Sequence, residues 1–244
     1  MDTIGREFIE KTKYHNLNPS DQMRGRPAPV LELGYNRSSN AVELPNPENI
    51  TVKPVDIRTA IEERRSVRHY ATIPLSVGEL SYLLWCTQGV KRVVHGSATM
   101  RTVPSAGARH AFETYLLANN VQGLEPGLYR YLALTHKLLQ FDTAPDMAKR
   151  VTQACLGQEF VGTCAVTFIW VAVPYRMTWR YSDRGYRYLY IDAGHVGQNL
   201  YLSARSIDCG VCAIAAFSDD DMNHILGLDG ENQFVIYIAT AGKL

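Results

Sequence analysis

The chain has 244 residues, of which 46% are hydrophobic and 20% are charged, and its formal net charge is +1. This composition is typical of a globular protein with one large domain or two small ones. The balanced charge gives no general electrostatic reason to bind nucleic acid or an acidic membrane. The longest apolar run, residues 165–174, is shorter than the ~18 residues of a membrane-spanning helix.

Residues 1–55 predict an irregular, proline-rich N-terminal arm. Six of the eleven prolines fall in this segment and interrupt any long periodicity. Such an arm would lie on the surface of its own domain or of a partner subunit, and partial disorder fits the composition equally well. We therefore expect the folded domain to span residues 56–244.

Residues 56–110 are expected to be helical. A short first helix ends at a cluster of arginines, and its apolar face is made by Ile57, Ala60 and Ile61. Ser76, with a glutamate three residues later, forms a capping box that begins a second helix. Gly89 is a suitable residue to end that helix. A loop of small residues, 96–107, follows.

Residues 111–244 are expected to alternate strands and helices. Segments rich in β-branched and aromatic residues predict strands at 112–118, 128–132, 137–141, 166–173 and 234–240. Helices are predicted at 146–155, 192–207 and 218–226, with Asp192 and Ser218 as N-caps. Because several strands follow one another through short turns, we predict an α+β fold with a mixed, largely antiparallel sheet flanked by helices.

Several motifs give little support for metal or nucleophilic chemistry. Cys209 and Cys212 have the spacing of a redox or zinc pair, but a structural zinc site needs a second pair of ligands, so buried packing is the simpler interpretation. The sequence has no Gly-x-Ser-x-Gly elbow. The aromatic residues of segment 175–190 suit either core and interface packing or one wall of a flat ligand pocket. Five cysteines at irregular spacing, with no apolar signal core at the N-terminus, favour a reducing, cytoplasmic setting.

Two stretches point to the binding of a phosphorylated, flat ligand. Residues 64–68, Arg-Arg-Ser-Val-Arg, place three guanidinium groups and one hydroxyl within five residues, which suits a phosphate dianion. A solvated basic helix end is the structural alternative. Residues 104–107, Pro-Ser-Ala-Gly, form a turn of small residues whose backbone donors can approach a flat ligand closely.

The order of these motifs resembles the nitroreductase superfamily and, within it, the SagB-type dehydrogenase branch. The resemblance covers roughly residues 57–243. It includes both stretches above, Gly-Leu-Tyr-Arg-Tyr at 127–131 and Asp-Ala-Gly-His-Val-Gly-Gln-Asn-Leu-Tyr-Leu at 192–202. It implies a nitroreductase-like α+β fold that forms an intertwined homodimer, with two FMN sites at the interface.

The resemblance also implies which residues bind FMN. Arg64, Ser66 and Arg68 would hold the phosphate, and Arg65 would contribute at least its backbone. Lys243, near the C-terminus, would also reach the phosphate.

Other residues would contact the flavin ring. The loop of Pro104, Ser105, Ala106 and Gly107 would reach the flavin of the partner subunit. Gln158 would meet the pyrimidine edge. The backbone amides of Ala215 and Ala216 would lie near flavin N5.

The sequence departs from the family pattern in places. Ala215-Ala216 stands where many nitroreductases have a glutamate-glycine pair, and Ala111 replaces a common proline. Azoline oxidases of the SagB-type branch use a lysine-tyrosine pair near the flavin. The nearest candidates here are Arg180-Tyr181 and Arg187-Tyr188, and arginine is a poor proton acceptor because it stays charged.

The expected function is that of an FMN-dependent oxidoreductase. NAD(P)H would be the transient donor, and a nitro compound, a quinone or a similar small organic molecule would be the acceptor. No side chain is assigned as catalytic. Two alternatives stay open: an azoline (thiazoline or oxazoline) dehydrogenase acting on a modified peptide, and a flavin-binding subunit without turnover. The expected partners are a second copy of the chain and a small substrate, with no nucleic acid, membrane or metal.

Overall fold

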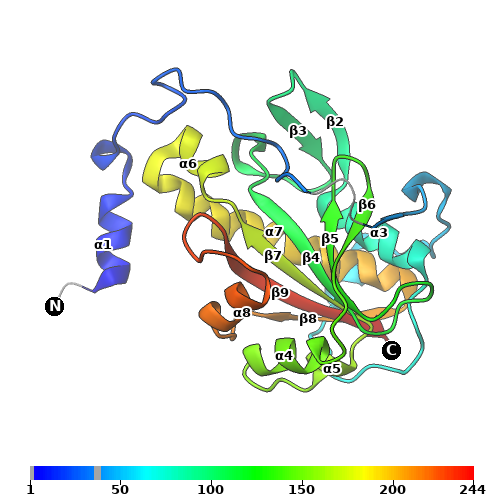
Figure 1. The fold of residues 1–244 in the computed structure, drawn as a ribbon. Coiled ribbons are helices and arrows are strands. Elements are labelled where there is room, and N and C mark those ends of the chain that lie inside the picture. Colours follow the sequence, from blue (N-terminus) through cyan, green and yellow to red (C-terminus); the bar gives the residue numbers. More distant parts are fainter. Residues whose placement is uncertain (1–2, 36–39) are drawn as a thin grey trace.

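The computed structural model describes residues 3–35 and 40–244. Figure 1 shows a sheet with helices on both of its faces, and an N-terminal segment that extends away from this body. The helices are α1 (Ile4–Lys11), α2 (Ile57–Glu62), α3 (Val77–Gln88), α4 (Met147–Ala154), α5 (Phe160–Thr163), α6 (Tyr175–Tyr181), α7 (Gly185–Ala204) and α8 (Asp219–Ile225). Within the described ranges, no helix combines the length and apolarity needed to span a membrane.

The main sheet has seven strands in the order β1-β6-β5-β4-β7-β9-β8, and every ladder in it is antiparallel. The strands are β1 (Ala41–Glu43), β4 (Phe112–Ala118), β5 (Gly127–Leu132), β6 (Lys137–Asp142), β7 (Val166–Ala172), β8 (Cys209–Ile214) and β9 (Phe234–Lys243). β2 (Val90–Val94) and β3 (Ala98–Arg101) form a separate hairpin. The predicted α+β fold with a largely antiparallel sheet is therefore confirmed.

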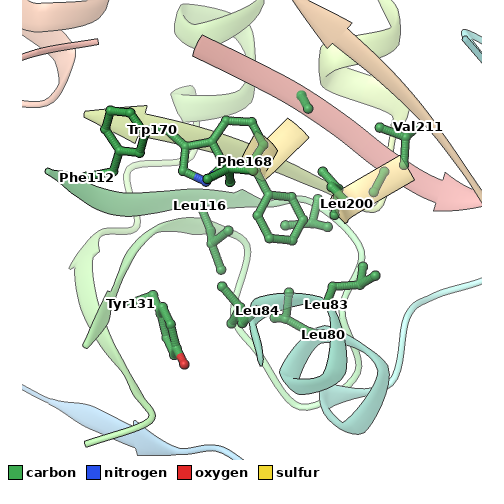
Figure 2. Close-up of a cluster of buried hydrophobic side chains, with 14 of the residues drawn as sticks. Leu80, Leu83, Leu84, Phe112, Leu116, Tyr131, Phe168, Trp170, Leu200 and Val211 are labelled. Atoms are coloured by element: carbon green, nitrogen blue, oxygen red, sulfur yellow. The ribbon is translucent and has the colours of Figure 1, made fainter. Parts of the chain in front are cut away.

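Both faces of the sheet are buried, so the strands at its centre carry apolar residues on both sides. One face packs against α3 and α7 through the cluster shown in Figure 2, where Leu84, Phe168 and Leu200 come from α3, β7 and α7. The other face packs against α4, α5 and α8, with Ile169 of β7 at its centre. Each large aliphatic side chain removed from water in this way contributes about 1.5–3 kcal/mol.

Several predicted elements are confirmed with their ends. Ser76 caps α3 in the expected capping box with Glu79, and Gly89 follows its last residue. Ser218 caps α8 by accepting a hydrogen bond from the backbone of Asp221. Val196, Leu200 and Ala204 on one face of α7, and Ile207 just beyond its end, are buried in the core.

The prediction that residues 56–110 form only helices and a loop is wrong for residues 90–101. These residues form the β2–β3 hairpin. His95 and Gly96 at its turn both have positive φ, of 48° and 65°. That conformation suits the tight turn of a hairpin, whose strands are joined here by residues 95–97, and the valines before it favour a strand.

Asp192 was predicted to begin the long helix, and this prediction is wrong. α7 begins seven residues earlier, at Gly185, because α6 turns directly into it. A Cβ atom at Gly185 would lie 3.0–3.1 Å from backbone atoms of Met177 and Thr178, so this position requires glycine for the two helices to approach. Asp192 lies inside α7 and uses its carboxylate elsewhere.

The apolar face predicted for the first helix is only partly buried. Ala60 of α2 packs inside, but Ile57 and Ile61 are 62% and 54% exposed. α2 is therefore held by one small residue and by its N-cap, Asp56, which accepts hydrogen bonds from Arg58 and Thr59. Two exposed isoleucines on one helix face are compatible with a partner surface.

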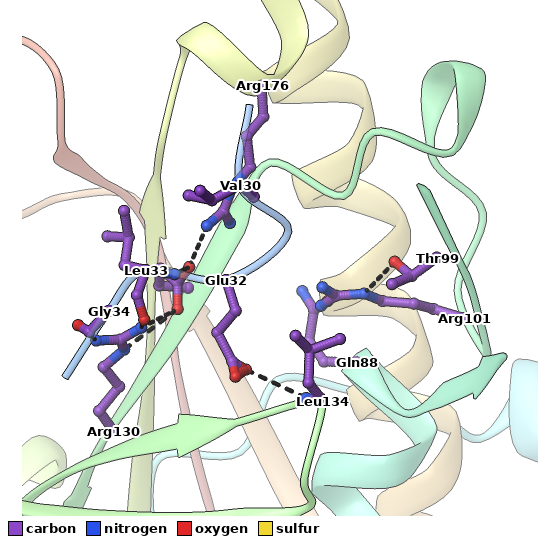
Figure 3. Close-up of polar contacts among 11 residues, drawn as sticks. Val30, Glu32, Leu33, Gly34, Gln88, Thr99, Arg101, Arg130, Leu134 and Arg176 are labelled. Atoms are coloured by element: carbon purple, nitrogen blue, oxygen red, sulfur yellow. Dashed lines mark hydrogen bonds and ion pairs between the residues drawn. The ribbon is translucent and has the colours of Figure 1, made fainter. Parts of the chain in front are cut away.

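The N-terminal arm was predicted to be irregular, and two of its segments are regular instead. α1 is capped by Thr3, and β1 joins the edge of the sheet beside β6. The arm is also held by a buried ion cluster (Figure 3). Glu113 of β4 pairs with Arg130 and Arg176, and these two arginines donate hydrogen bonds to backbone carbonyls of residues 30, 33 and 34.

Candidate cofactor site on one face of α7

The arginine-rich segment runs along the edge of the main sheet. Ser66 forms a parallel bridge with Val211 of β8, and the backbone N–H of Val67 donates a hydrogen bond of 2.9 Å to the carbonyl of Val211. A Cβ atom at Gly210 would lie 2.8 Å from the side chain of Val67, so glycine permits this close approach. Segment 64–68 is thus fixed to β8 rather than left as a loose helix end.

Tyr201 of α7 brings two of the predicted phosphate ligands together. Its hydroxyl lies 2.9 Å from Ser66 Oγ, and the guanidinium of Arg64 lies 5.3 Å from the centre of its ring. The same hydroxyl accepts a hydrogen bond of 2.9 Å from the backbone of Ala213 in β8. Tyr201 therefore joins the arginine-rich segment, α7 and β8 at one point.

The positive charges of this segment have no internal counter-charge. In the described ranges, no carboxylate forms an ion pair with Arg64, Arg65 or Arg68, because the neighbouring Glu63 is paired with Arg205. Like charges within five residues repel one another in the absence of an anion. The donor set of this segment, with the hydroxyl of Ser66 among it, fits a phosphate dianion.

A continuous series of contacts connects Arg68 with the other predicted residues. The guanidinium of Arg68 lies 5.9 Å from the ring centre of Phe160, at the start of α5. Two residues earlier, Gln158 donates hydrogen bonds from its amide nitrogen to the carbonyls of Cys155 and Ala216, at 2.8 and 2.9 Å. The structure therefore brings Gln158 and Ala216 into contact.

A pocket of about 400 Å³ opens beside Ala215. It lies between α7, the loop that joins β8 to α8, and β9, with Tyr190, Gly194, Phe217 and Tyr237 among its lining residues. Its aromatic and apolar walls suit a flat ring system, and its volume falls in the range of small-ligand sites.

One face of α7 connects this pocket with the arginine-rich segment. Tyr190, Gly194, Gly197 and Tyr201 are spaced by three or four residues, so they lie along the same face of the helix. A Cβ atom at Gly194 would meet no atom within 4 Å, whereas one at Gly197 would lie 2.8 Å from the ring of Tyr237. The two glycines thus keep one groove open and allow β9 to pack closely.

The Pro104–Gly107 loop lies on the opposite face of α7. The backbone N–H of Ala106 donates a hydrogen bond of 3.2 Å to Asp192 Oδ1, and Ser105 Oγ accepts one of 2.9 Å from the backbone of His110. Burial raises the pKa of the Asp192 carboxyl, and the hydrogen bond from Ser105 opposes part of this rise. Asp192 is two residues from Tyr190, which places it about 200° around the helix. A single chain therefore does not bring this loop to the pocket.

The side chain of Lys243 is directed to α3. Its ammonium donates hydrogen bonds to Glu79 and, at 2.6 Å, to the carbonyl of Ile207. Glu79 also completes the capping box of α3. The charge of Lys243 is thus largely satisfied by Glu79.

Sequence reasoning assigned no role to Tyr201 and Phe160. Tyr201 falls within the quoted Asp192–Leu202 motif, and its spacing of seven residues from Gly194 is the signal that places it on the pocket face of α7. Phe160 carried no comparable signal, because its contact with Arg68 joins segments that lie far apart in the chain.

An antiparallel sheet between two helical layers, with an arginine-rich edge and an aromatic pocket on one helix face, defines a nitroreductase-like protein. The model of the Nitroreductase family matches residues 61–243, and the chain belongs to that family.

Two curated proteins are similar in sequence. A protein of Methanocaldococcus jannaschii that carries the name nitroreductase is 36% identical over 186 residues, which are 76% of this chain and 88% of that protein. The trifolitoxin-processing protein TfxB of Rhizobium leguminosarum bv. trifolii is 26% identical over 162 residues, which are 62% of this chain but only 41% of TfxB.

Solved structures share the fold. A crystal structure from Anabaena variabilis, also named for nitroreductase, has a TM-score of 0.69 and 30% identity, over 85% of this chain and 42% of that one. The chain thus spans less than half the length of that protein. The Escherichia coli microcin synthetase McbBCD complex, with truncated pro-MccB17 bound, has a TM-score of 0.62 and 17% identity, over 99% of this chain and 94% of that one. A nitroreductase-named structure in complex with FMN, from Desulfovibrio desulfuricans, has a TM-score of 0.55 and 14% identity, over 78% of this chain and 87% of that one.

Proposed function

We propose that this protein is an FMN-dependent oxidoreductase whose flavin is reduced by NAD(P)H and reoxidised by a nitro compound, a quinone or a similar small organic acceptor. The observation that carries the proposal is that Arg64 and Ser66 of the arginine-rich segment contact Tyr201, at one end of an α7 face whose other end lines an aromatic pocket. Membership of the Nitroreductase family and the likeness to a structure in complex with FMN support the proposal.

Different residues of the site would bind different parts of FMN. Arg64, Ser66 and Arg68 would bind the phosphate. The amide oxygen of Gln158 accepts no hydrogen bond within the described part of the chain, so it is available to the pyrimidine edge. The backbone around Ala215 would face the ring from the pocket wall. When bound, FMN supplies the hydride chemistry, and the protein orients it and excludes water from its ring.

The proposal also covers the setting and organisation of the chain. Residues 56–244 would form the flavin domain and residues 1–55 the arm. All five cysteines are free, as expected for a reducing, cytoplasmic setting.

Purified protein should show the absorbance spectrum of an oxidised flavin, and this should bleach on anaerobic addition of NADH or NADPH. The reduced protein should then pass electrons to a quinone or a nitroaromatic. A colourless protein that cannot be loaded with FMN would contradict the proposal. A protein that binds FMN but neither accepts nor donates electrons would instead be a non-catalytic flavin-binding subunit.

Azoline dehydrogenation on a modified peptide is the second candidate, in line with a SagB-type assignment. It is favoured by the likenesses to a trifolitoxin-processing protein and to a microcin synthetase complex. Against it, segment 175–190 contains arginines but no lysine or histidine, and its only carboxylate, Asp183, is exposed. A general base needs a pKa near the working pH.

We therefore expect no dehydrogenation of an azoline peptide under conditions in which NAD(P)H reduces the flavin readily. Mass spectrometry of the peptide, which detects the loss of two hydrogens, measures this directly. Azoline turnover without any reaction toward nicotinamides would reverse the order of the two candidates.

We further propose that the site is completed by a second copy of the chain, because the Pro104–Gly107 loop lies on the wrong face of α7 to reach the pocket of its own subunit. A stable FMN-loaded monomer in light scattering would contradict this.

A complementation experiment tests the loop directly. Arg68→Ala removes a candidate phosphate ligand. Gly107→Ala puts a Cβ on a residue with a φ of +57°, a conformation that residues with a side chain rarely adopt, and thereby disturbs the loop.

Each variant alone should bind FMN poorly. Co-expressed with two affinity tags and purified as the mixed dimer, they should recover one intact site, built from the arginines of one subunit and the loop of the other. Recovery of about half of the wild-type flavin content is the expected result. If the loop acted within its own subunit, the mixed dimer would contain no intact site and would stay empty.

A further inference from the structure

A second pocket, of about 290 Å³, lies between the N-terminal arm and the end of α6. The arm supplies apolar walls from Tyr14, Leu17, Pro19 and Met23, and α6 supplies Arg180 and Tyr181. No aspartate or glutamate is among the described residues that line it. The pocket is therefore apolar along one side and positively charged on the other.

The two residues of α6 that line the pocket, Arg180 and Tyr181, both carry hydrogen-bond donors. In the described part of the chain, the guanidinium of Arg180 and the hydroxyl of Tyr181 make no hydrogen bond or ion pair. Arg180 lies over the ring of Tyr181, 5.6 Å from its centre, and is exposed. An arginine presents several donors in a fixed planar fork, and a tyrosine hydroxyl adds one more. Two adjacent donors that only solvent satisfies within the described part of the chain are suited to an oxyanion.

These donors lie against the loop that is proposed to meet the flavin. A Cβ atom at Gly107 would lie 2.4 Å from the hydroxyl of Tyr181 and 2.9 Å from Nε of Arg180. The loop is held in a strained form, since Gly107, Ala108 and His110 all have positive φ, between 43° and 57°. Strain of this kind in non-glycine residues is concentrated at functional sites.

A second arginine adds to the positive charge of this region. Arg109 donates hydrogen bonds to the carbonyls of Gly107 and Ser97, and its guanidinium stacks on Trp179 at 5.3 Å. Burial, together with the positive charge of Arg180, lowers the pKa of Arg109. Both guanidinium groups lie against Gly107, so their like charges repel each other and a bound anion would relieve that repulsion.

We infer that this pocket binds the substrate-side anion: a carboxylate or phosphate carried on an apolar body, held by Arg180 and Tyr181 while the body lies against the arm. The inference rests on the proposed function, because Gly107 belongs to the loop that would contact the flavin. It makes Arg180 and Tyr181 determinants of substrate specificity, and it gives the arm a role in forming the pocket.

The test uses two matched nitroaromatics, 4-nitrobenzoate and 4-nitrobenzamide, which differ in charge but hardly in shape. Calorimetry on the purified protein measures their binding, and steady-state reduction measures their KM. We expect the wild-type protein to prefer the benzoate, and Arg180→Gln to weaken benzoate binding about tenfold while leaving the benzamide unchanged. Arg92→Gln is the matched control, since Arg92 is exposed on β2, loses the same charge and does not line the pocket.

Other outcomes are decisive as well. Equal binding of the two compounds, or equal losses for both in Arg180→Gln, would overturn the anion site even if both compounds were reduced. Preferential benzoate binding that depends on Arg180 would support the anion site even if the protein reduced neither compound. In that case the proposed oxidoreductase function would be contradicted, but the anion site would not. To test whether the bound anion is a phosphate rather than a carboxylate, the comparison is repeated with NADPH and NADH, which differ by one phosphate.

Discussion

Glu113→Gln is expected to destabilise the protein by about 3–5 kcal/mol, the usual cost of removing one partner from a buried ion pair. Glu113 is 3% exposed. Oε2 accepts hydrogen bonds from Nε and Nη2 of Arg130, at 3.2 and 2.9 Å, and Oε1 accepts from Arg176 and from the backbone of Leu33. The substitution would leave two buried guanidinium groups with no counter-charge.

The measurement is the free energy of unfolding in urea, together with limited proteolysis around residues 30–34. Cleavage there should accelerate, because Arg130 and Arg176 hold the backbone of this segment. Glu62→Gln is the matched control: it breaks an exposed ion pair with Arg58 and should change stability by less than about 1 kcal/mol. An equally small effect at Glu113 would show that the cluster does not hold the arm.

The same cluster predicts how stability depends on pH. Burial by itself would raise the pKa of the Glu113 carboxyl, but the charges of Arg176 and Arg130 and the N–H of Leu33 outweigh it and hold the pKa below 4.5. A carboxyl whose pKa is lowered by folding binds protons more weakly in the folded state. Its contribution is therefore complete above pH 4.5 and is lost as the pH falls through the lowered value. Glu113→Gln should remove this part of the acid sensitivity.

Arg68→Ala is expected to weaken FMN binding by roughly 10- to 100-fold, since charge-assisted hydrogen bonds contribute about 1.5–3 kcal/mol each. The guanidinium of Arg68 lies over the ring of Phe160, which follows Gln158 by two residues in the chain. The fold should be unaffected, because the side chain makes no hydrogen bond within the described residues. Fluorescence titration with FMN measures the affinity, and circular dichroism checks the fold.

Arg58→Ala is a suitable control for this prediction. It removes the same charge from the neighbouring helix α2, where Arg58 pairs with Glu62. If Arg68→Ala binds FMN with wild-type affinity, Arg68 is not a ligand of the phosphate. Equal losses in both variants would indicate a general effect of net charge rather than a specific contact.

The sequence by itself determined the elements whose signals are local. The capping box at Ser76 set the start of α3, and Gly89 marked its end. The β-branched and aromatic runs located the central strands. The arginines of segment 64–68 were recognisable as a candidate anion site because they are adjacent in the chain, and this pattern does not depend on the rest of the fold.

Only the tertiary structure decided the features that depend on distant contacts. Asp192 looked like an N-cap, but the packing of α6 on Gly185 began the helix earlier and left its carboxylate to hold Ala106. In the sequence, Glu113 is a single polar residue within a predicted strand. Only the fold brings Arg130 and Arg176 to its carboxylate. The separation of the Pro104–Gly107 loop from the pocket, on opposite faces of α7, is likewise invisible in the sequence. Contacts of this kind join segments that are far apart in the chain. A local pattern of residues does not predict which distant segments come into contact.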